Sequence, residues 1–256
     1  MSMLLLVSLM LGTGLNIINT PSAVASTNKP LATHLSAGET HTVGLKKDGT
    51  VIATGRNSSS QLAIENWTDI TEVSAGGLHT VGLKKDGTVL SAGSNSDGQR
   101  NVDNWENIIQ VAAGRAHTVG LKEDGTVVAT GGNFYNQTNV ADWEDIVYIA
   151  AGMHHTIGVK KDGTVIATGI NNHGQANVDD WKDIIQVAAN LYHTIGLKSD
   201  GSVVAVGSNS SGQINVEDWQ DIAQITSGAV HTVGVKKDGT VVATGFNVFG
   251  QIEVGD

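Results

Sequence analysis

Short runs of apolar residues, separated by glycine-containing turns, recur along most of the chain and predict β-strands. In one stretch the runs cover residues 108–114, 117–121 and 126–131, and an Asp-Gly pair, Asp124-Gly125, separates the second from the third. Asp-Gly between two apolar runs is typical of a β-hairpin with a type I′ turn, in which both central residues have positive φ. The pattern therefore predicts an all-β unit of short antiparallel strands.

The same unit occurs six times. The motif His-Thr-Val/Ile-Gly recurs every 38 residues, beginning at His41, His79, His117, His155, His193 and His231. One glutamine per unit and five tryptophans, from Trp67 to Trp219, keep this period, and residues 29–256 hold six whole periods. We predict one domain over 29–256, a closed β-propeller of six blades with three to four short antiparallel strands each. A linear β-solenoid is the alternative.

The first 25 residues differ from the repeats. Residues 3–15 are almost wholly apolar, and Ala23-Val24-Ala25 precedes Ser26. This run is too short to span a membrane and fits a secretory signal peptide over 1–25, cleaved near Ala25-Ser26 and followed by a short linker over 26–28. The segment lacks the usual Lys or Arg, so a start further upstream or a retained segment are alternatives. We expect a secreted, extracytoplasmic protein without a membrane span.

Composition narrows the chemistry. The chain carries 15 basic and 25 acidic residues, a formal net charge of −10, which argues against binding to nucleic acid. It has no cysteine, and hence no disulfide, thiolate nucleophile or cysteine-based metal site. Motifs of serine hydrolases, phosphate-binding loops and zinc proteases are missing from the sequence. We therefore expect no enzyme activity, no cofactor and no metal.

The residues repeated in every unit suit structural roles. Rotational equivalence would spread the six histidines around a ring, whereas metal ligands must converge on one ion. We expect these histidines to satisfy backbone groups at the strand starts. The tryptophans share one position in the link between units, which favours a wedge between neighbouring blades.

Two short windows vary between repeats. The first lies between Ala-Gly and His, the second inside Asn-x-x-x-Gln, and the strand order places both on one edge, here called the top face. Apolar and aromatic residues gather there, and exposed aromatics on loops of a rigid scaffold mark recognition surfaces. The candidate partner-binding residues are Arg115, Phe134, Tyr135, Met153, His154, His173, Leu191, Tyr192, Phe246, Val248 and Phe249. In the alternative, some of the aromatics fold inward and plug the ring.

The repeat, Val-Ala-Ala-Gly-x-x-His-Thr-x-Gly-Leu-Lys-x-Asp-Gly-Thr-Val, resembles that of the regulator of chromosome condensation family. The 38-residue period and the export-type leader are more similar to the bacterial propeller-type β-lactamase inhibitory proteins. The resemblance implies a propeller that contacts a protein target through its first-window loops. Those relatives have seven blades, more aromatic loops and a proline-containing link, where this chain has six periods, Glu39-Thr40 and Arg115-Ala116, and Asp-Trp-x-Asp-Ile.

These observations predict a secreted, monomeric, non-enzymatic protein that binds a protein partner through its top face. Inhibition of an extracellular enzyme is one form that this function could take. A lectin-like propeller is an alternative, although it would need the same polar and aromatic set in every repeat. Nucleotide exchange on a small GTPase is a second alternative.

Overall fold

The structure, a computed structural model, describes residues 35–254. The predicted signal peptide, the linker and the start of the first repeat lie outside the described residues. Within 35–254, no helix has the length and apolar character needed to cross a membrane.

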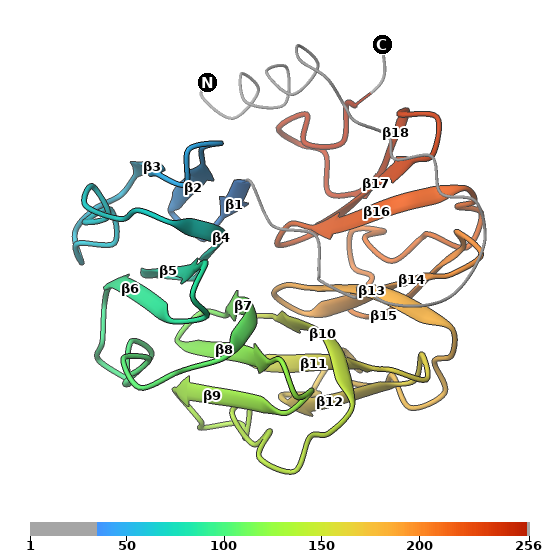
Figure 1. Cartoon of the computed structure of the whole chain (residues 1–256). Helices are drawn as coiled ribbons and strands as arrows, with labels where there is room; N and C mark the ends of the chain where they lie inside the picture. The colour runs from blue at the N-terminus through green and yellow to red at the C-terminus, as the bar shows by residue number, and fades with distance from the viewer. Residues whose placement is uncertain (1–34, 255–256) are drawn as a thin grey trace.

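Each repeat forms one three-stranded antiparallel sheet, called a blade, with its strands paired in chain order (Figure 1). The number of strands per blade, predicted as three to four, is three in the described chain. The blades are, in order, β1 (Leu35–Ala37), β2 (His41–Leu45) and β3 (Val51–Gly55); β4 (Ile70–Ala75), β5 (His79–Lys84) and β6 (Val89–Gly93); β7 (Ile108–Ala113), β8 (His117–Lys122) and β9 (Val127–Gly131); β10 (Ile146–Ala151), β11 (His155–Lys160) and β12 (Val165–Gly169); β13 (Ile184–Ala189), β14 (His193–Lys198) and β15 (Val203–Gly207); β16 (Ile222–Ser227), β17 (His231–Lys236) and β18 (Val241–Gly245).

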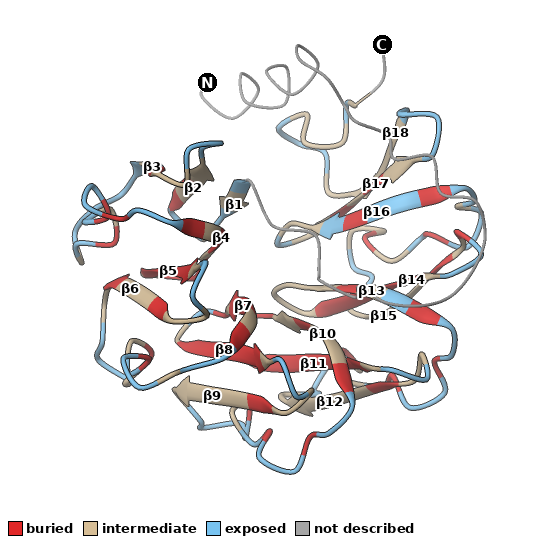
Figure 2. Ribbon diagram, in the orientation of Figure 1, coloured by how far each residue is buried: buried red, intermediate tan, exposed pale blue. Residues whose placement is uncertain are grey.

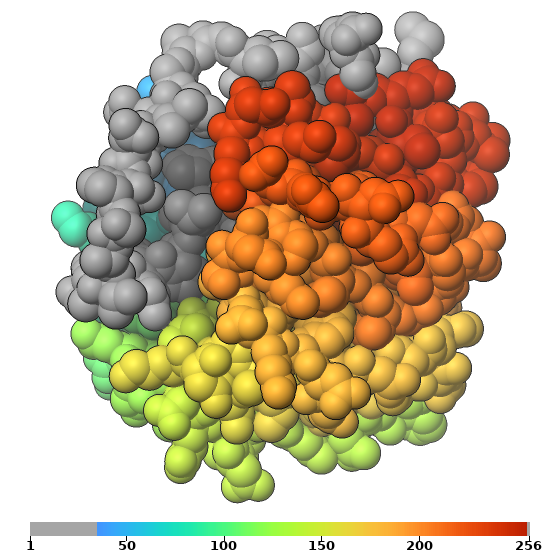
Figure 3. Space-filling model, turned by 90° about the vertical axis from the view of Figure 1, so that its right-hand side faces the viewer, coloured from blue at the N-terminus to red at the C-terminus, as the bar shows by residue number. Residues whose placement is uncertain are grey.

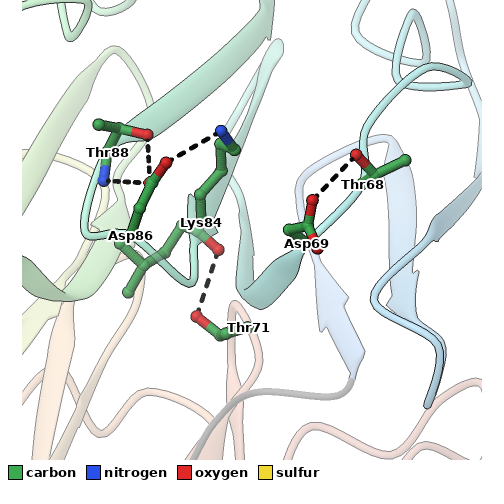
Figure 4. Close-up of polar contacts among 7 residues, drawn as sticks. Thr68, Asp69, Thr71, Lys84, Asp86 and Thr88 are labelled. Carbon is green, nitrogen blue, oxygen red and sulfur yellow. Dashed lines mark hydrogen bonds and ion pairs between the residues drawn. The ribbon is translucent and has the colours of Figure 1, made fainter.

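The Asp-Gly hairpins differ from the prediction in turn type. In the hairpin between β5 and β6, Gly87 has positive φ, +81°, but Asp86 does not, whereas a type I′ turn would need positive φ at both residues. The amide of Gly87 donates to the carbonyl of Lys84, 3.0 Å, which describes a type I turn followed by a left-handed glycine. The Asp86 carboxylate accepts hydrogen bonds from the amide and hydroxyl of Thr88, 3.1 and 2.6 Å (Figure 4). This carboxylate stabilises the turn and explains the Asp at this position.

The blades are arranged around an axis with their first strands innermost. The first strand of each blade contacts the first strand of the next, from β1 and β4 through to β13 and β16, while the third strands lie at the outer edge (Figure 1). Buried residues concentrate in the middle strands (Figure 2). The last three blades stack in chain order in the side view (Figure 3). The top-face loops are therefore carried by a rigid, layered scaffold.

Tryptophans fill the spaces between neighbouring blades. Trp143, in the link that follows blade three, belongs to one buried cluster with Leu121 of blade three and Ile149 of blade four. Its ring lies against Gly158 of β11, where an added Cβ would stand only 2.8 Å from the indole. Large aromatics contribute to stability mainly through the area they bury. The predicted wedge role is confirmed.

Closure of the ring is not confirmed. Extensive contacts join each blade to the next from the first to the sixth. Within residues 35–254, no contact of that extent joins β16–β18 to β1–β3, and the two terminal blades stand apart in the view of Figure 1.

Candidate functional site

The second window of each repeat is a turn held by its own side chains. In blade three the Asn133 side chain accepts a hydrogen bond from the amide of Thr138, 3.0 Å. The buried Gln137 side chain accepts one from the amide of Tyr135, 2.9 Å. Phe134 lies in the same turn and is 88% exposed. The turn therefore presents two variable side chains from a fixed backbone.

The first windows are bonded to one another around the axis. The amide of Gly77 in blade two donates to the carbonyl of Arg115 in blade three, 3.2 Å. The amide of Arg115 donates weakly to Met153 in blade four, 3.4 Å, and that of Met153 to Asn190 in blade five, 3.1 Å. The first windows of blades two, three and four, together with Asn190 directly before the first window of blade five, thus form one connected rim near the axis.

The structure brings aromatic and imidazole rings together across two junctions. Tyr135 of blade three lies against His154 of blade four, with ring centroids 5.1 Å apart, and Phe134 packs edge-on against Tyr135 at 4.9 Å. His173 of blade four lies against Tyr192 of blade five at 4.7 Å. Both pairs join the second window of one blade to the first window of the next, with Tyr and His exchanged. The same two positions at the other inner junctions hold Ser59 and Leu78, Asp97 and Ala116, and Ser211 and Val230.

The candidate residues fall into two groups. The blade 3–5 group consists of Arg115, Phe134, Tyr135, Met153, His154, His173, Leu191 and Tyr192. The blade-six group consists of Phe246, Val248 and Phe249, with the two phenylalanine rings 6.1 Å apart. The second-window members are exposed, whereas Met153, His154, Leu191, Tyr192 and Phe246 are half-buried. None of the candidates is fully buried, so the structure does not show the alternative in which aromatics plug the ring.

An ion pair crosses the top face near the axis. The guanidinium of Arg115 in blade three lies 3.3 Å from the carboxylate of Glu39 in blade one, and both side chains are partly exposed. Gly77 of blade two lies between them in the chain of first windows; a Cβ there would stand 2.6 Å from the Arg115 carbonyl oxygen. Sequence reasoning missed this pair. The sequence did hold a signal for it, because Glu39 and Arg115 place opposite charges at the same first-window position of two repeats.

His154 is half-buried and close enough to both charges of the ion pair to feel them. Partial burial lowers the pKa of His154, the Arg115 charge lowers it further, and Glu39 opposes the shift. The ring is therefore uncharged at neutral pH and adds to the aromatic character of the blade 3–5 group.

The repeated histidines form a buried chain between blades. In five junctions the Nε2 atom of one histidine lies 2.9–3.3 Å from a threonine hydroxyl of the next blade: His41 with Thr80, His79 with Thr118, His117 with Thr156, His155 with Thr194 and His193 with Thr232. The expectation that they would bond to the backbone at the strand starts is wrong, because the partner is a side chain in the neighbouring blade.

Hydrogen-bond directions fix the state of these histidines. The hydroxyl of Thr156 donates to the carbonyl of Gln137, 2.7 Å, so it can only accept from His117, which must carry its proton on Nε2. The Nδ1 atom of His117 is buried without a partner. Burial lowers the pKa to about 3 for His117 and His155 and to about 4 for His79 and His193. These imidazoles are neutral structural links, and residues 35–254 hold no cluster of potential metal ligands.

Comparisons with known proteins agree with this architecture. The model of the regulator of chromosome condensation (RCC1) repeat matches the chain in all six periods, at residues 32–61, 70–99, 108–137, 146–175, 184–213 and 222–251. No curated protein matches the chain by sequence.

Several solved structures share the fold. Prp20p from Saccharomyces cerevisiae has a TM-score of 0.72 at 18% identity, covering 87% of this chain and 73% of its own. Human WBSCR16 has a TM-score of 0.71 at 18% identity, covering 87% and 78%. The CRINKLY WD40 ectodomain of the Arabidopsis thaliana receptor kinase ACR4 has a TM-score of 0.68 at 21% identity, covering 84% and 85%. Since the repeat model accounts for most of the chain, this protein belongs to the regulator of chromosome condensation (RCC1) repeat family.

Proposed function

We propose that this protein is a non-enzymatic scaffold that binds a protein partner through the blade 3–5 group of its top face. The observation that carries the proposal is the exposure of aromatic side chains on turns that asparagine and glutamine side chains hold in place. Phe134 is 88% exposed although its own turn is fixed by three side-chain hydrogen bonds. An aromatic held in water by a rigid loop loses little side-chain entropy when a partner covers it.

The distribution of the aromatics favours one asymmetric partner. Tyrosine–histidine pairs occur at two of the inner junctions, and the equivalent positions elsewhere are mainly small or polar. A lectin-like propeller with one site per blade would need similar groups at every junction. Tyrosine and arginine are also enriched among the residues that dominate protein–protein binding energy.

The comparisons support the same partner class. Prp20p is described as binding Gsp1p and histones, and yeast RCC1 (Prp20) as bound by Kap60. In our proposal this chain likewise binds protein, outside the cytoplasm because of the signal-peptide pattern in residues 1–25. An extracellular enzyme is the candidate target. The proposal includes a monomeric protein and a closed ring, in which the first and sixth blades pack as inner neighbours do.

Alanine variants on the top face, compared with an alanine variant on the opposite, hairpin face, test the proposal. The protein would be used as bait on the extracellular fraction of its source, and the captured protein titrated against each variant. We expect Phe134→Ala, Tyr135→Ala and Tyr192→Ala to weaken binding, by about 2 kcal/mol or roughly 30-fold at a hot spot. The control is Lys161→Ala on the opposite, hairpin face, which should bind as the parent does.

Two results would contradict the proposal. In one, Lys161→Ala abolishes binding while the aromatic variants retain it. In the other, the aromatic variants lose thermal stability along with binding, which would show that these rings are part of the core. A captured protein that simple sugars release from the bait would favour the lectin alternative.

A further inference from the structure

The two kinds of basic side chain lie on different parts of the fold. The chain has twelve lysines and only three arginines. Ten of the lysines lie in the Lys-x-Asp-Gly hairpins that follow the middle strands, on the hairpin face. All three arginines, Arg56, Arg100 and Arg115, lie in or directly beside the windows of the top face. The two residue types are not interchangeable at interfaces, because the planar guanidinium can bind a carboxylate through two parallel hydrogen bonds.

The arginines occupy three consecutive blades. The amide of Arg56 donates to the carbonyl of Thr40, 2.9 Å, which places this residue beside the first window of blade one. Arg115 of blade three reaches Glu39 of that same window, 3.3 Å. Arg100 stands at the end of the second-window turn of blade two. These three side chains, here called the arginine sector, therefore cover the top face of blades one to three.

Each guanidinium is held on one side and keeps N–H donors for a ligand. The Nε atom of Arg56 donates to the hydroxyl of Ser58, 2.7 Å, and that of Arg115 takes part in the ion pair. Neither side chain makes a further polar contact with a described residue, so both terminal nitrogens of each remain available. Arg100 is half-buried, donates through Nη1 to the carbonyl of Gly93, 2.9 Å, and keeps its Nη2 atom. Because these contacts already restrict the side chains, less entropy is lost when a carboxylate binds.

The charge of the arginine sector suits individual carboxylates better than a polyanion. The windows of blades one to three contain two acidic residues, Glu39 and Asp97, so three positive charges against two negative leave a net charge of +1. Nucleic acids and sulfated polysaccharides are bound by many basic groups together, each of which releases a counterion. Three separate guanidiniums with a small net charge fit a partner that offers a few carboxylates.

The remaining windows have a different chemistry. Those of blades four to six contain no lysine, arginine, aspartate or glutamate, and the two tyrosine–histidine junctions lie between blades three and five. Arg115 stands at the boundary, since it pairs with Glu39 of blade one while burial and then the Arg115 charge lower the pKa of His154 in blade four. The top face therefore has a basic sector that adjoins an aromatic one.

We propose that the protein partner presents Asp or Glu carboxylates beside an apolar patch, with the carboxylates bound by the arginine sector and the apolar patch covering the blade 3–5 group. This inference rests on the proposed function and adds the chemistry and the orientation of the partner. The terminal nitrogens of Arg115 bind one of the partner's carboxylates in competition with Glu39. The lysines of the hairpin face take no part.

Charge-matched variants test the inference with the captured protein. Arg56→Gln and Arg115→Gln should each weaken binding about fivefold, and the loss should shrink as added salt screens the charges. Lys161→Gln removes the same charge from the hairpin face and should bind as the parent does. Glu39→Gln should bind more tightly than the parent, because it removes the carboxylate that competes for Arg115. If the arginine variants bind as the parent does, or Glu39→Gln binds more weakly, while Phe134→Ala still loses binding, this inference is overturned and the proposed function stands.

A selection of random peptides displayed on phage tests the same chemistry without the natural partner. The parent and a triple variant, Arg56→Gln, Arg100→Gln and Arg115→Gln, would serve as parallel targets after thermal unfolding has shown that both are folded. Peptides that bind the parent but not the variant should be enriched in Asp and Glu together with apolar residues. A selection without this acidic enrichment would overturn the inference. So would retention of the parent, but not of the triple variant, on immobilised heparin, since a sulfated polysaccharide would then be the ligand.

Discussion

Mild acid should destabilise this protein strongly because the buried histidines cannot take up protons in the folded state. Burial lowers the pKa of four of them, His79, His117, His155 and His193, from 6.5 to about 3 or 4. In the unfolded chain the same groups titrate near 6.5. Below pH 6.5 the unfolded state therefore binds more protons than the folded state, and the free energy of unfolding falls as the pH falls.

The magnitude follows from the shifts. At pH 5 a group with a pKa near 6.5 unfolded and 3 to 4 folded reduces the free energy of unfolding by about 2 kcal/mol. Four such groups together remove roughly 8 kcal/mol, comparable with the entire stability of a typical domain. His41 and His231 shift in the same direction and add to the effect. The hairpin aspartates, including Asp86 with a pKa of about 2, contribute only at lower pH.

Urea unfolding followed by tryptophan fluorescence from pH 8 to pH 5 measures this dependence. Stability should be nearly constant above pH 7 and then fall with a slope of about four protons, roughly 5 kcal/mol per pH unit. In His117→Gln, whose side-chain amide nitrogen corresponds in position to the histidine Nε2 and can donate to Thr156, the slope should decrease by about one proton. Constant stability between pH 7 and pH 5, or an unchanged slope in the variant, would refute the assignment of these histidines as neutral links.

Two further predictions concern the junctions between blades. Thr156→Val leaves the Nε2 proton of His117 buried without an acceptor and should cost about 1–3 kcal/mol in urea unfolding, whereas Thr156→Ser should retain most of the stability. Gly158→Ala places a Cβ 2.8 Å from Trp143 and should cost roughly 1–3 kcal/mol, whereas Gly44→Ala, which meets no indole, should cost distinctly less; equal losses at both glycines would contradict the wedge role.

Much of the fold could be predicted from the sequence because each local pattern occurs once in each of six repeats. The period, the strands, the hairpin positions and the wedge role of the tryptophans could all be derived from local patterns. The turn type could not, since Asp-Gly is compatible with more than one turn and the Asp86–Thr88 hydrogen bonds favour a type I turn here. Closure of the ring could not be derived from the repeat pattern either. It depends on the angle between neighbouring blades, and the volume of the side chains at each junction determines that angle.

The sequence located the candidate residues but did not show which of them contact one another. The aromatic positions were visible as departures from the repeat. Their pairing, Tyr135 with His154 and His173 with Tyr192, depends on how far one blade is rotated from the next. The ion pair of Glu39 and Arg115 joins blades one and three, and so depends on the first windows converging near the axis. The histidine–threonine bonds were missed for the same reason, since each partner lies 39 residues away in another blade.

Site-specific photo-crosslinking shows directly whether the top face binds a protein partner. Benzoylphenylalanine would replace Phe134 in one variant and Lys161, on the opposite hairpin face, in another. After irradiation with the extracellular fraction of the source, we expect one crosslinked protein for the Phe134 variant, which excess unlabelled parent protein competes away, and no such product for the Lys161 variant. A competable product from the Lys161 variant together with none from the Phe134 variant would show that the top face is not the binding surface.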